Sequence, residues 1–157
     1  MMLQSTVNKR KKIDLSSAPW TMHEFFAGSG LVAYGLKGMF APVWANDISA
    51  QKATVYKANF GDDHFELDDI KNVKGNDLPF ANLSWASFPC QDLSLAGAIG
   101  GIHAERSGLV WEWLRVLDEM ERKPKILLLE NVAGLLSTHI GDNYRVLHIC
   151  LLYTSDA

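Results

Sequence analysis

The chain has 157 residues, of which 48% are hydrophobic and 21% charged, and its formal net charge is −3. This composition is ordinary for one globular domain with a sizeable core. Two cysteines are too few for a disulfide scaffold, and an acidic balance argues against a self-sufficient nucleic-acid-binding surface, which is usually basic. No apolar run is long enough to span a membrane and no signal segment follows the basic residues 9–12, so we expect a cytoplasmic protein without a membrane partner.

The first 20 residues are polar and basic, and they end in a Ser-Ser-Ala-Pro stretch before the first apolar run. We interpret residues 1–20 as a flexible basic arm. It is either a solvated tail or a contact for phosphate groups.

Strand-like and helix-like segments then alternate along the chain. Short apolar runs predict strands at residues 22–26, 42–46, 65–70, 83–88 and 126–129. Helical spacing predicts helices at residues 31–37, between a Ser49 cap and a Gly61 stop, at 105–122 and from 132 to 137, with loops at 71–82 and 91–104. This alternation predicts an α/β fold with a doubly wound, mostly parallel sheet.

A glycine-rich turn separates the first predicted strand from the first helix. Gly28 and Gly30 allow a sharp turn and a close approach of backbone to a ligand, although such a turn also occurs without one. Asp47 follows the second strand, where an acid can accept hydrogen bonds from ribose hydroxyls or cap a helix. Asp69 follows the third strand and is a candidate acceptor for an adenine amino group, with Asp68 beside it as the competing choice.

A cysteine and an acid follow two later strands. Cys90 comes after the strand at 83–88 and Glu130 after the strand at 126–129, so both are expected at the carboxyl edge of a parallel sheet, where ligands bind. A thiolate with a carboxyl group can attack an electron-poor ring and protonate it. The alternatives are a buried structural Cys90 and a salt-bridged Glu130. If Glu130 lies in an apolar setting, its pKa would rise, which suits a proton donor.

Five segments together resemble the DNA cytosine-5 methyltransferase family, over about residues 21–148. The pairing of Pro-Cys-Gln with Glu-Asn-Val some forty residues later is highly specific. The segments are residues 24–30 (EFFAGSG), 46–47 (ND), 88–94 (FPCQDLS), 106–109 (RSGL) and 130–132 (ENV).

The resemblance implies a truncated, Rossmann-like methyltransferase fold with S-adenosylmethionine as cofactor. It implies that a cytosine, flipped out of double-stranded DNA, is attacked at carbon 6 by Cys90 and methylated on carbon 5. The catalytic residues would be Cys90, Glu130, Asn131 and Arg106, and the substrate-binding residues Gln91 and Ser94. The cofactor-binding residues would be Phe26, Ala27, Gly28, Ser29, Gly30, Asp47, Ile48, Asp69, Ile70 and Pro89.

The resemblance also implies a bacterial or phage-borne enzyme, expected as a monomer, and leaves open a cognate restriction endonuclease as partner. Two positions depart from the family pattern: Glu24 stands where Asp is usual, and Leu31 where a second glycine is frequent. The family's later arginine motif, recognition domain and last motifs are missing, so we expect a partial catalytic domain at residues 21–149 that is inactive alone.

The last residues have an unusual coding string. DNA that encodes residues 150–157 resembles the end of a transposon-type sequencing adaptor, so we interpret this tail as non-native rather than as a genuine C-terminus. Three other functions stay open: a transfer-RNA cytosine methyltransferase, a non-catalytic cofactor-binding module, and a nicotinamide-binding oxidoreductase. The last gives Cys90 and Glu130 no role.

Overall fold

A computed structural model describes residues 12–15, 17–88 and 108–131 of the chain. Its centre is a five-stranded sheet in which all neighbouring strands run parallel, in the order β3-β2-β1-β4-β5. The strands are β1 (Trp20–Phe25), β2 (Phe40–Asn46), β3 (Phe65–Glu66), β4 (Leu83–Ala86) and β5 (Ile126–Leu129). The predicted α/β fold with a doubly wound parallel sheet is confirmed.

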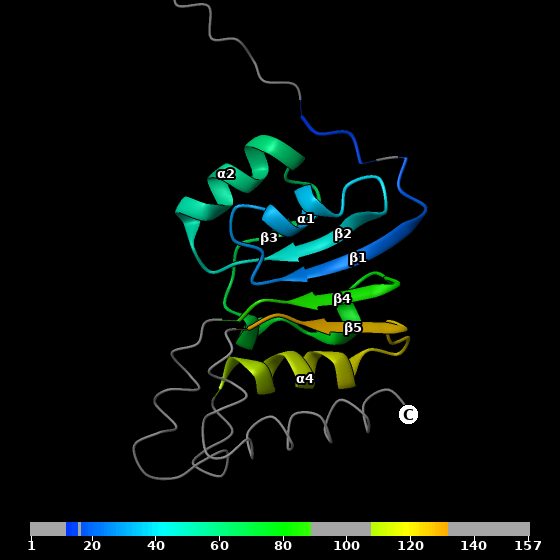
Figure 1. The fold of residues 1–157 in the computed structure, drawn as a ribbon. Coiled ribbons are helices and arrows are strands. Elements are labelled where there is room, and N and C mark those ends of the chain that lie inside the picture. Colours follow the sequence, from blue (N-terminus) through cyan, green and yellow to red (C-terminus); the bar gives the residue numbers. More distant parts are fainter. Residues whose placement is uncertain (1–11, 16, 89–107, 132–157) are drawn as a thin grey trace, which may run out of the picture.

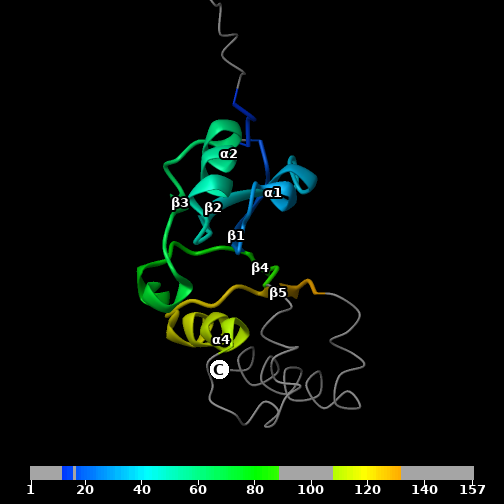
Figure 2. The same ribbon diagram turned by 90° about the vertical axis from the view of Figure 1, so that its left-hand side faces the viewer.

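Helices cover both faces of the sheet. The helices α1 (Leu31–Gly35) and α2 (Ala50–Phe60) lie on one face, and α4 (Leu109–Glu119) lies on the other (Figure 1). Two short 3₁₀ turns, η1 (Ile70–Asn72) and η2 (Gly75–Asp77), lie on the α4 side. Figure 2 looks onto the carboxyl ends of the strands and shows the sheet between these two layers.

Each face of the sheet has its own hydrophobic core, because successive side chains of a strand point to opposite faces. On β1, Met22 packs with the α1 and α2 side, whereas Phe25 packs with the α4 side. The α4 core also contains Trp113, whose indole N–H donates to the Ser84 hydroxyl at 3.0 Å, so these two buried polar groups are paired.

The ends of several elements match the sequence pattern. The Ser49 hydroxyl accepts a hydrogen bond from the Lys52 N–H at 3.4 Å, and α2 ends at Gly61, whose φ is +100°. The strand predicted at 126–129 is β5, and the helix predicted at 105–122 is described as α4 from Leu109 to Glu119. The loop predicted at 91–104 and the helix predicted at 132–137 lie outside the described residues.

The third strand is shorter than predicted, because β3 stops at Glu66 whereas the sequence suggested residues 65–70. The Asp69 carboxylate accepts from the Lys71 N–H at 3.0 Å and starts the 3₁₀ turn η1. Such side-chain bonds to nearby backbone compete with a strand's ladder. The apolar Ile70 therefore belongs to a turn, and the predicted loop at 71–82 contains η1 and η2.

The strand order places a switch point between β1 and β4. β1 continues through α1 to β2 on one side, while β4 and β5 extend the sheet on the other. Ligands of open α/β sheets bind in the crevice at the carboxyl ends of the strands, at this point. Within the described ranges, no helix is long and apolar enough to cross a bilayer.

Candidate active site

The glycine turn after β1 forms the floor of the site at the switch point. Phe26, Gly28 and Gly30 all have positive φ angles, of 58°, 58° and 85°. The Ala27 N–H donates to the Asn46 carbonyl at 2.8 Å, which ties the turn to the end of β2. A side chain at Gly30 would run into the Phe60 ring, whereas one at Gly28 would meet nothing nearer than Lys52 Cδ at 4.0 Å. Gly30 thus serves helix packing, and Gly28 leaves room for a ligand.

Asp47 connects this turn to α2. One carboxylate oxygen accepts from the Gly28 N–H and the other from the Ser49 N–H, both at 2.8 Å, and the residue is buried. The helix cap itself is Ser49, so the alternative that Asp47 is the cap is not what the structure shows. Each oxygen of a carboxylate has a second lone pair, so Asp47 still has the capacity to accept hydroxyl groups of a ligand. Ile48 beside it is 69% exposed and offers an apolar surface.

Asp68 and Asp69, which follow β3, make different hydrogen bonds. Asp68 accepts from the Asp69 N–H at 2.7 Å and from the Asn72 side-chain amide at 2.8 Å, so it serves the fold of this segment. Asp69 uses Oδ1 to accept from the Lys71 N–H and is half-buried. Of the two acids, Asp69 is the better placed for a ligand. The Ile70 side chain is buried in the α4 core, which leaves only its main chain for one.

The carboxyl ends of β4 and β5 are joined by two hydrogen bonds. The Glu130 N–H donates to the Ala86 carbonyl at 2.9 Å, and the Asn131 side-chain amide donates to the Phe88 carbonyl at 3.1 Å. The Phe88 ring also meets Phe26 of the glycine turn edge-on, with centroids 6.5 Å apart. The ends of β1, β4 and β5 therefore form one connected edge.

The Glu130 side chain is exposed, so the described residues do not give it the apolar setting that the sequence left open. Of the β5 side chains before it, Leu127 and Leu129 are partly buried against the α4 core, whereas Ile126 and Leu128 are exposed. Five predicted site residues lie outside the described residues: Pro89, Cys90, Gln91, Ser94 and Arg106.

Glu24 forms a buried polar group directly behind the glycine turn. It has no exposed surface, and its carboxyl oxygens accept from the Ala33 N–H and the Tyr56 hydroxyl, both at 3.4 Å. The Tyr56 hydroxyl also lies 3.2 Å from His64 Nε2. Burial raises the pKa of Glu24 to about 7, against the opposing effect of these hydrogen bonds. The longer acid at this position thus braces α1 and α2.

This pKa predicts how stability changes with pH. The folded chain keeps the Glu24 proton up to about pH 7, whereas the unfolded chain releases it near 4.5. The protonated Glu24 therefore contributes its full stabilisation of the folded chain below pH 4.5. This contribution is lost as the pH rises through 7. Relative to Glu24→Gln, the wild type should lose up to about 3 kcal/mol of unfolding free energy between pH 5 and 8.

Urea unfolding of both proteins at several pH values measures this difference. Glu121→Gln, which removes an exposed carboxyl group, serves as the control and should run parallel to the wild type. Parallel profiles for wild type and Glu24→Gln would show that Glu24 does not titrate in this range.

Sequence comparison identifies the family. A family model for C-5 cytosine-specific DNA methylases matches residues 20–151. The chain belongs to this family. It is 36% identical over 129 residues to the type II methyltransferase M.Bsp6I of Bacillus sp. (strain RFL6), covering 80% of this chain and 40% of that protein. It is 34% identical over 128 residues to M.BsuFI of Bacillus subtilis, covering 81% and 30% respectively.

Solved methyltransferase structures share the fold. The Dnmt2 methyltransferase of S. pombe superimposes with a TM-score of 0.62 at 24% identity, over 82% of this chain and 38% of that one. A TehB-like SAM-dependent methyltransferase from Corynebacterium glutamicum superimposes with a TM-score of 0.55 at 11% identity, over 85% and 65%. At these identities the likeness concerns the fold, and it confirms the predicted Rossmann-like methyltransferase architecture.

Proposed function

We propose that this methylase-family protein transfers a methyl group from S-adenosylmethionine to carbon 5 of a cytosine in DNA. The observation that carries the proposal is the pair of hydrogen bonds between the ends of β4 and β5. Phe88 stands two residues before Cys90, and its carbonyl is bound by Asn131, the neighbour of Glu130. This arrangement supports a thiol and a carboxyl group acting on one ring.

The residues at the ends of β1, β2 and β3 fit S-adenosylmethionine in chemical type. Glycine-turn main chain at residues 26–30 would accept the methionine part, and Asp47 the ribose hydroxyls. The adenine would be held by the exposed apolar Ile48, the Asp69 carboxylate and the Ile70 main chain. We propose Pro89 as a further cofactor-binding residue. The cofactor supplies the methyl group when bound.

The chain's own residues provide the activation. Carbon 5 of cytosine is not nucleophilic enough unaided, and a covalent bond next to it divides the barrier into smaller steps. The Cys90 thiolate adds to carbon 6 of the flipped base while Glu130 protonates or hydrogen-bonds ring N3, so electron density moves to carbon 5. After methylation a base removes the carbon 5 proton, the ring double bond re-forms, and the Cys90 sulfur leaves.

Other residues hold the base and the DNA. Asn131 braces the site through the Phe88 carbonyl. Arg106 positions the cytosine or its backbone, Gln91 contacts the substrate, and Ser94 contacts phosphate. We propose a monomeric bacterial or phage-borne enzyme that acts in the cytoplasm on double-stranded DNA. The type II methyltransferase relatives favour a restriction-modification context, with a restriction endonuclease as partner.

The chain spans about a third of the length of the curated relatives it matches, 40% of M.Bsp6I and 30% of M.BsuFI. We propose that residues 21–149 are part of the catalytic domain, that residues 1–20 are an arm, and that residues 150–157 are a non-native tail. We also propose that these 157 residues alone do not turn over.

A methyl-transfer assay tests the function. Full-length enzyme is incubated with tritiated S-adenosylmethionine and either unmethylated bacterial DNA or transfer RNA. Tritium should appear on carbon 5 of cytosine in DNA, and not in RNA. Label in transfer RNA alone would instead support the RNA substrate, and label in neither would favour a non-catalytic cofactor-binding module.

A further inference from the structure

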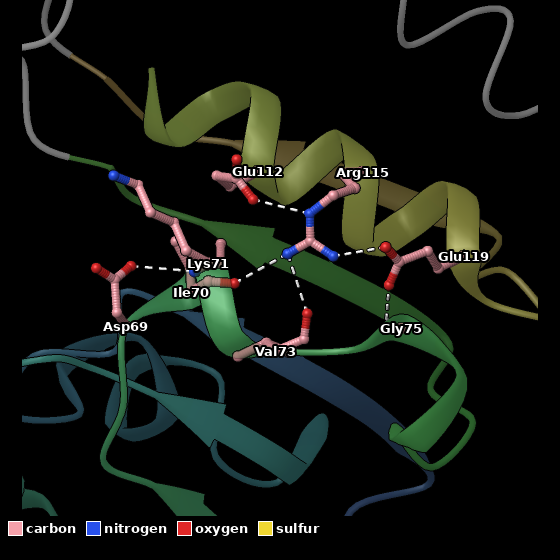
Figure 3. Close-up of polar contacts among 8 residues, drawn as sticks. All are labelled: Asp69, Ile70, Lys71, Val73, Gly75, Glu112, Arg115 and Glu119. Atoms are coloured by element: carbon pink, nitrogen blue, oxygen red, sulfur yellow. Dashed lines mark hydrogen bonds and ion pairs between the residues drawn. The ribbon is translucent and has the colours of Figure 1, made fainter. Parts of the chain in front are cut away.

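One arginine on α4 binds the segment that carries Asp69. The Arg115 guanidinium donates through Nη2 to the Ile70 carbonyl at 3.1 Å and to the Val73 carbonyl at 3.0 Å (Figure 3). The first carbonyl belongs to the first residue of η1, and the second to the residue that directly follows it. Arg115 therefore fixes the turn immediately after Asp69.

Two acids on the same helix hold the guanidinium in place. Glu112 accepts from Arg115 Nε at 2.8 Å and Glu119 accepts from Nη1 at 2.6 Å. The other Glu119 oxygen accepts from the Gly75 N–H at 2.9 Å, as Figure 3 also shows. A side chain at Gly75 would run into the Val116 carbonyl, so the segment lies directly against the helix. The three charged side chains form one fixed support for residues 70–75.

The opposite end of the segment is fixed by the sheet. The Asn46 side-chain amide at the end of β2 donates to the Asp68 carbonyl at 2.8 Å and to the Glu66 carbonyl at 3.2 Å. Asn46 thus holds the main chain just before Asp69, and Arg115 holds the main chain just after it. Its Oδ1 is oriented by the Lys71 N–H, which belongs to the turn that Arg115 binds.

We propose that Arg115 is a positioning residue for the adenine end of the cofactor site, an inference that rests on the proposed function. It acts through η1, by fixing the direction of the Asp69 carboxylate and of the Ile70 main chain toward the base. A lysine cannot replace it, because only the planar guanidinium can donate to two carboxylates and two carbonyls at once.

The exposure of Arg115, Glu112 and Glu119 distinguishes a positioning role of Arg115 from a contribution to folding stability. The Arg115, Glu112 and Glu119 side chains are 34%, 20% and 34% exposed, so water screens their ion pairs, and the pairs themselves contribute little to folding. Ile70 and Val73 are buried in the α4 core, and this apolar packing does not involve the guanidinium. We therefore expect Arg115 variants to fold, with η1 less well fixed.

The test uses two ligands that differ at the adenine amino group. Isothermal titration calorimetry of the full-length enzyme measures the dissociation constants of S-adenosylhomocysteine and of its analogue with an unsubstituted purine. The wild type should prefer adenine by about tenfold, as one hydrogen bond to a charged acceptor allows. In Arg115→Lys and Arg115→Met the preference should fall below about threefold, because the bond to Asp69 is lost.

Kinetics provide the second readout. In both variants the KM for S-adenosylmethionine should rise about tenfold while kcat at saturation stays within about twofold, since binding and not chemistry is affected. Lys123→Met is the matched control: it removes the Lys123–Asp118 ion pair, 3.3 Å long, which does not touch residues 69–75. It should leave the preference and KM unchanged.

Four results would overturn the inference. An unchanged adenine preference in the Arg115 variants would show that Arg115 does not act on Asp69, as would an equal loss of affinity for both ligands. A wild type without any preference would show that Asp69 does not read the amino group. A wild type that binds neither ligand would overturn the cofactor assignment itself, and the inference with it.

Discussion

Cys90→Ser is expected to lower the kcat for methyl transfer by at least about a thousandfold in the full-length enzyme. A serine hydroxyl is almost fully protonated at neutral pH and is a far poorer nucleophile than a thiolate, so carbon 5 is no longer activated. S-adenosylmethionine should still bind, because most of the proposed cofactor residues follow β1, β2 and β3 and are separate from Cys90. Tritium transfer measures the rate, and calorimetry measures the binding.

A conservative substitution away from the candidate site provides the control for this variant. Thr54→Ser changes an exposed side chain on α2 and should leave the rate unaltered. A Cys90→Ser enzyme that keeps a near-normal rate would show that another group is the nucleophile.

Glu130→Gln is expected to lower kcat by about a hundredfold to ten-thousandfold, the range for loss of a general acid. Glutamine preserves the length and shape of the side chain but has no proton to give to ring N3. The backbone bond from residue 130 to the Ala86 carbonyl is independent of the side chain, so the end of β5 should stay in place. Steady-state kinetics on cytosine-containing DNA, with the KM for S-adenosylmethionine measured in parallel, check this.

Glu121→Gln again serves as the comparison, since it removes an exposed acid that follows α4. Comparison of the two variants separates the loss of the Glu130 proton from a general change in charge. If Glu130→Gln slowed the enzyme less than about threefold, the role of Glu130 as acid would be wrong.

Local sequence patterns were sufficient for most of the sheet. Alternation of short apolar runs with helical spacing predicted the parallel sheet, and the Ser49 and Gly61 signals matched the ends of α2, because these signals act over a few residues. The strand at 126–129 was predicted to the residue for the same reason: Pro124 precedes it and the polar Glu130 follows it.

Features that depend on distant residues were not predictable in this way. Arg115 binds carbonyls 45 and 42 residues earlier in the chain, and no local pattern announces such a pair. The α4 core also buries Ile70, which the sequence predicts as the last residue of the third strand. The exposure of Glu130 depends on what covers one face of β5, and three leucines in a row do not reveal it.

In the candidate site, too, local patterns predict the residues, whereas their distant contacts come from the fold. The sequence predicts Asp47 and the glycine turn as two separate ligand contacts, and the structure shows that the Asp47 carboxylate accepts from the Gly28 N–H at 2.8 Å. The resemblance implies Asn131 only as a catalytic residue, and the structure shows that its side-chain amide donates to the Phe88 carbonyl at 3.1 Å. The roles of Pro89, Cys90, Gln91, Ser94 and Arg106 remain proposals for experiment.

The most direct test of the account is to trap the covalent bond between the enzyme and cytosine. A DNA duplex with fluorine on carbon 5 of the target cytosine prevents the final proton removal, so the adduct at carbon 6 should accumulate. Mass spectrometry of the digested complex should place the nucleotide on the sulfur of Cys90. Turnover of normal DNA without any adduct, or an adduct on a different residue, would contradict the mechanism.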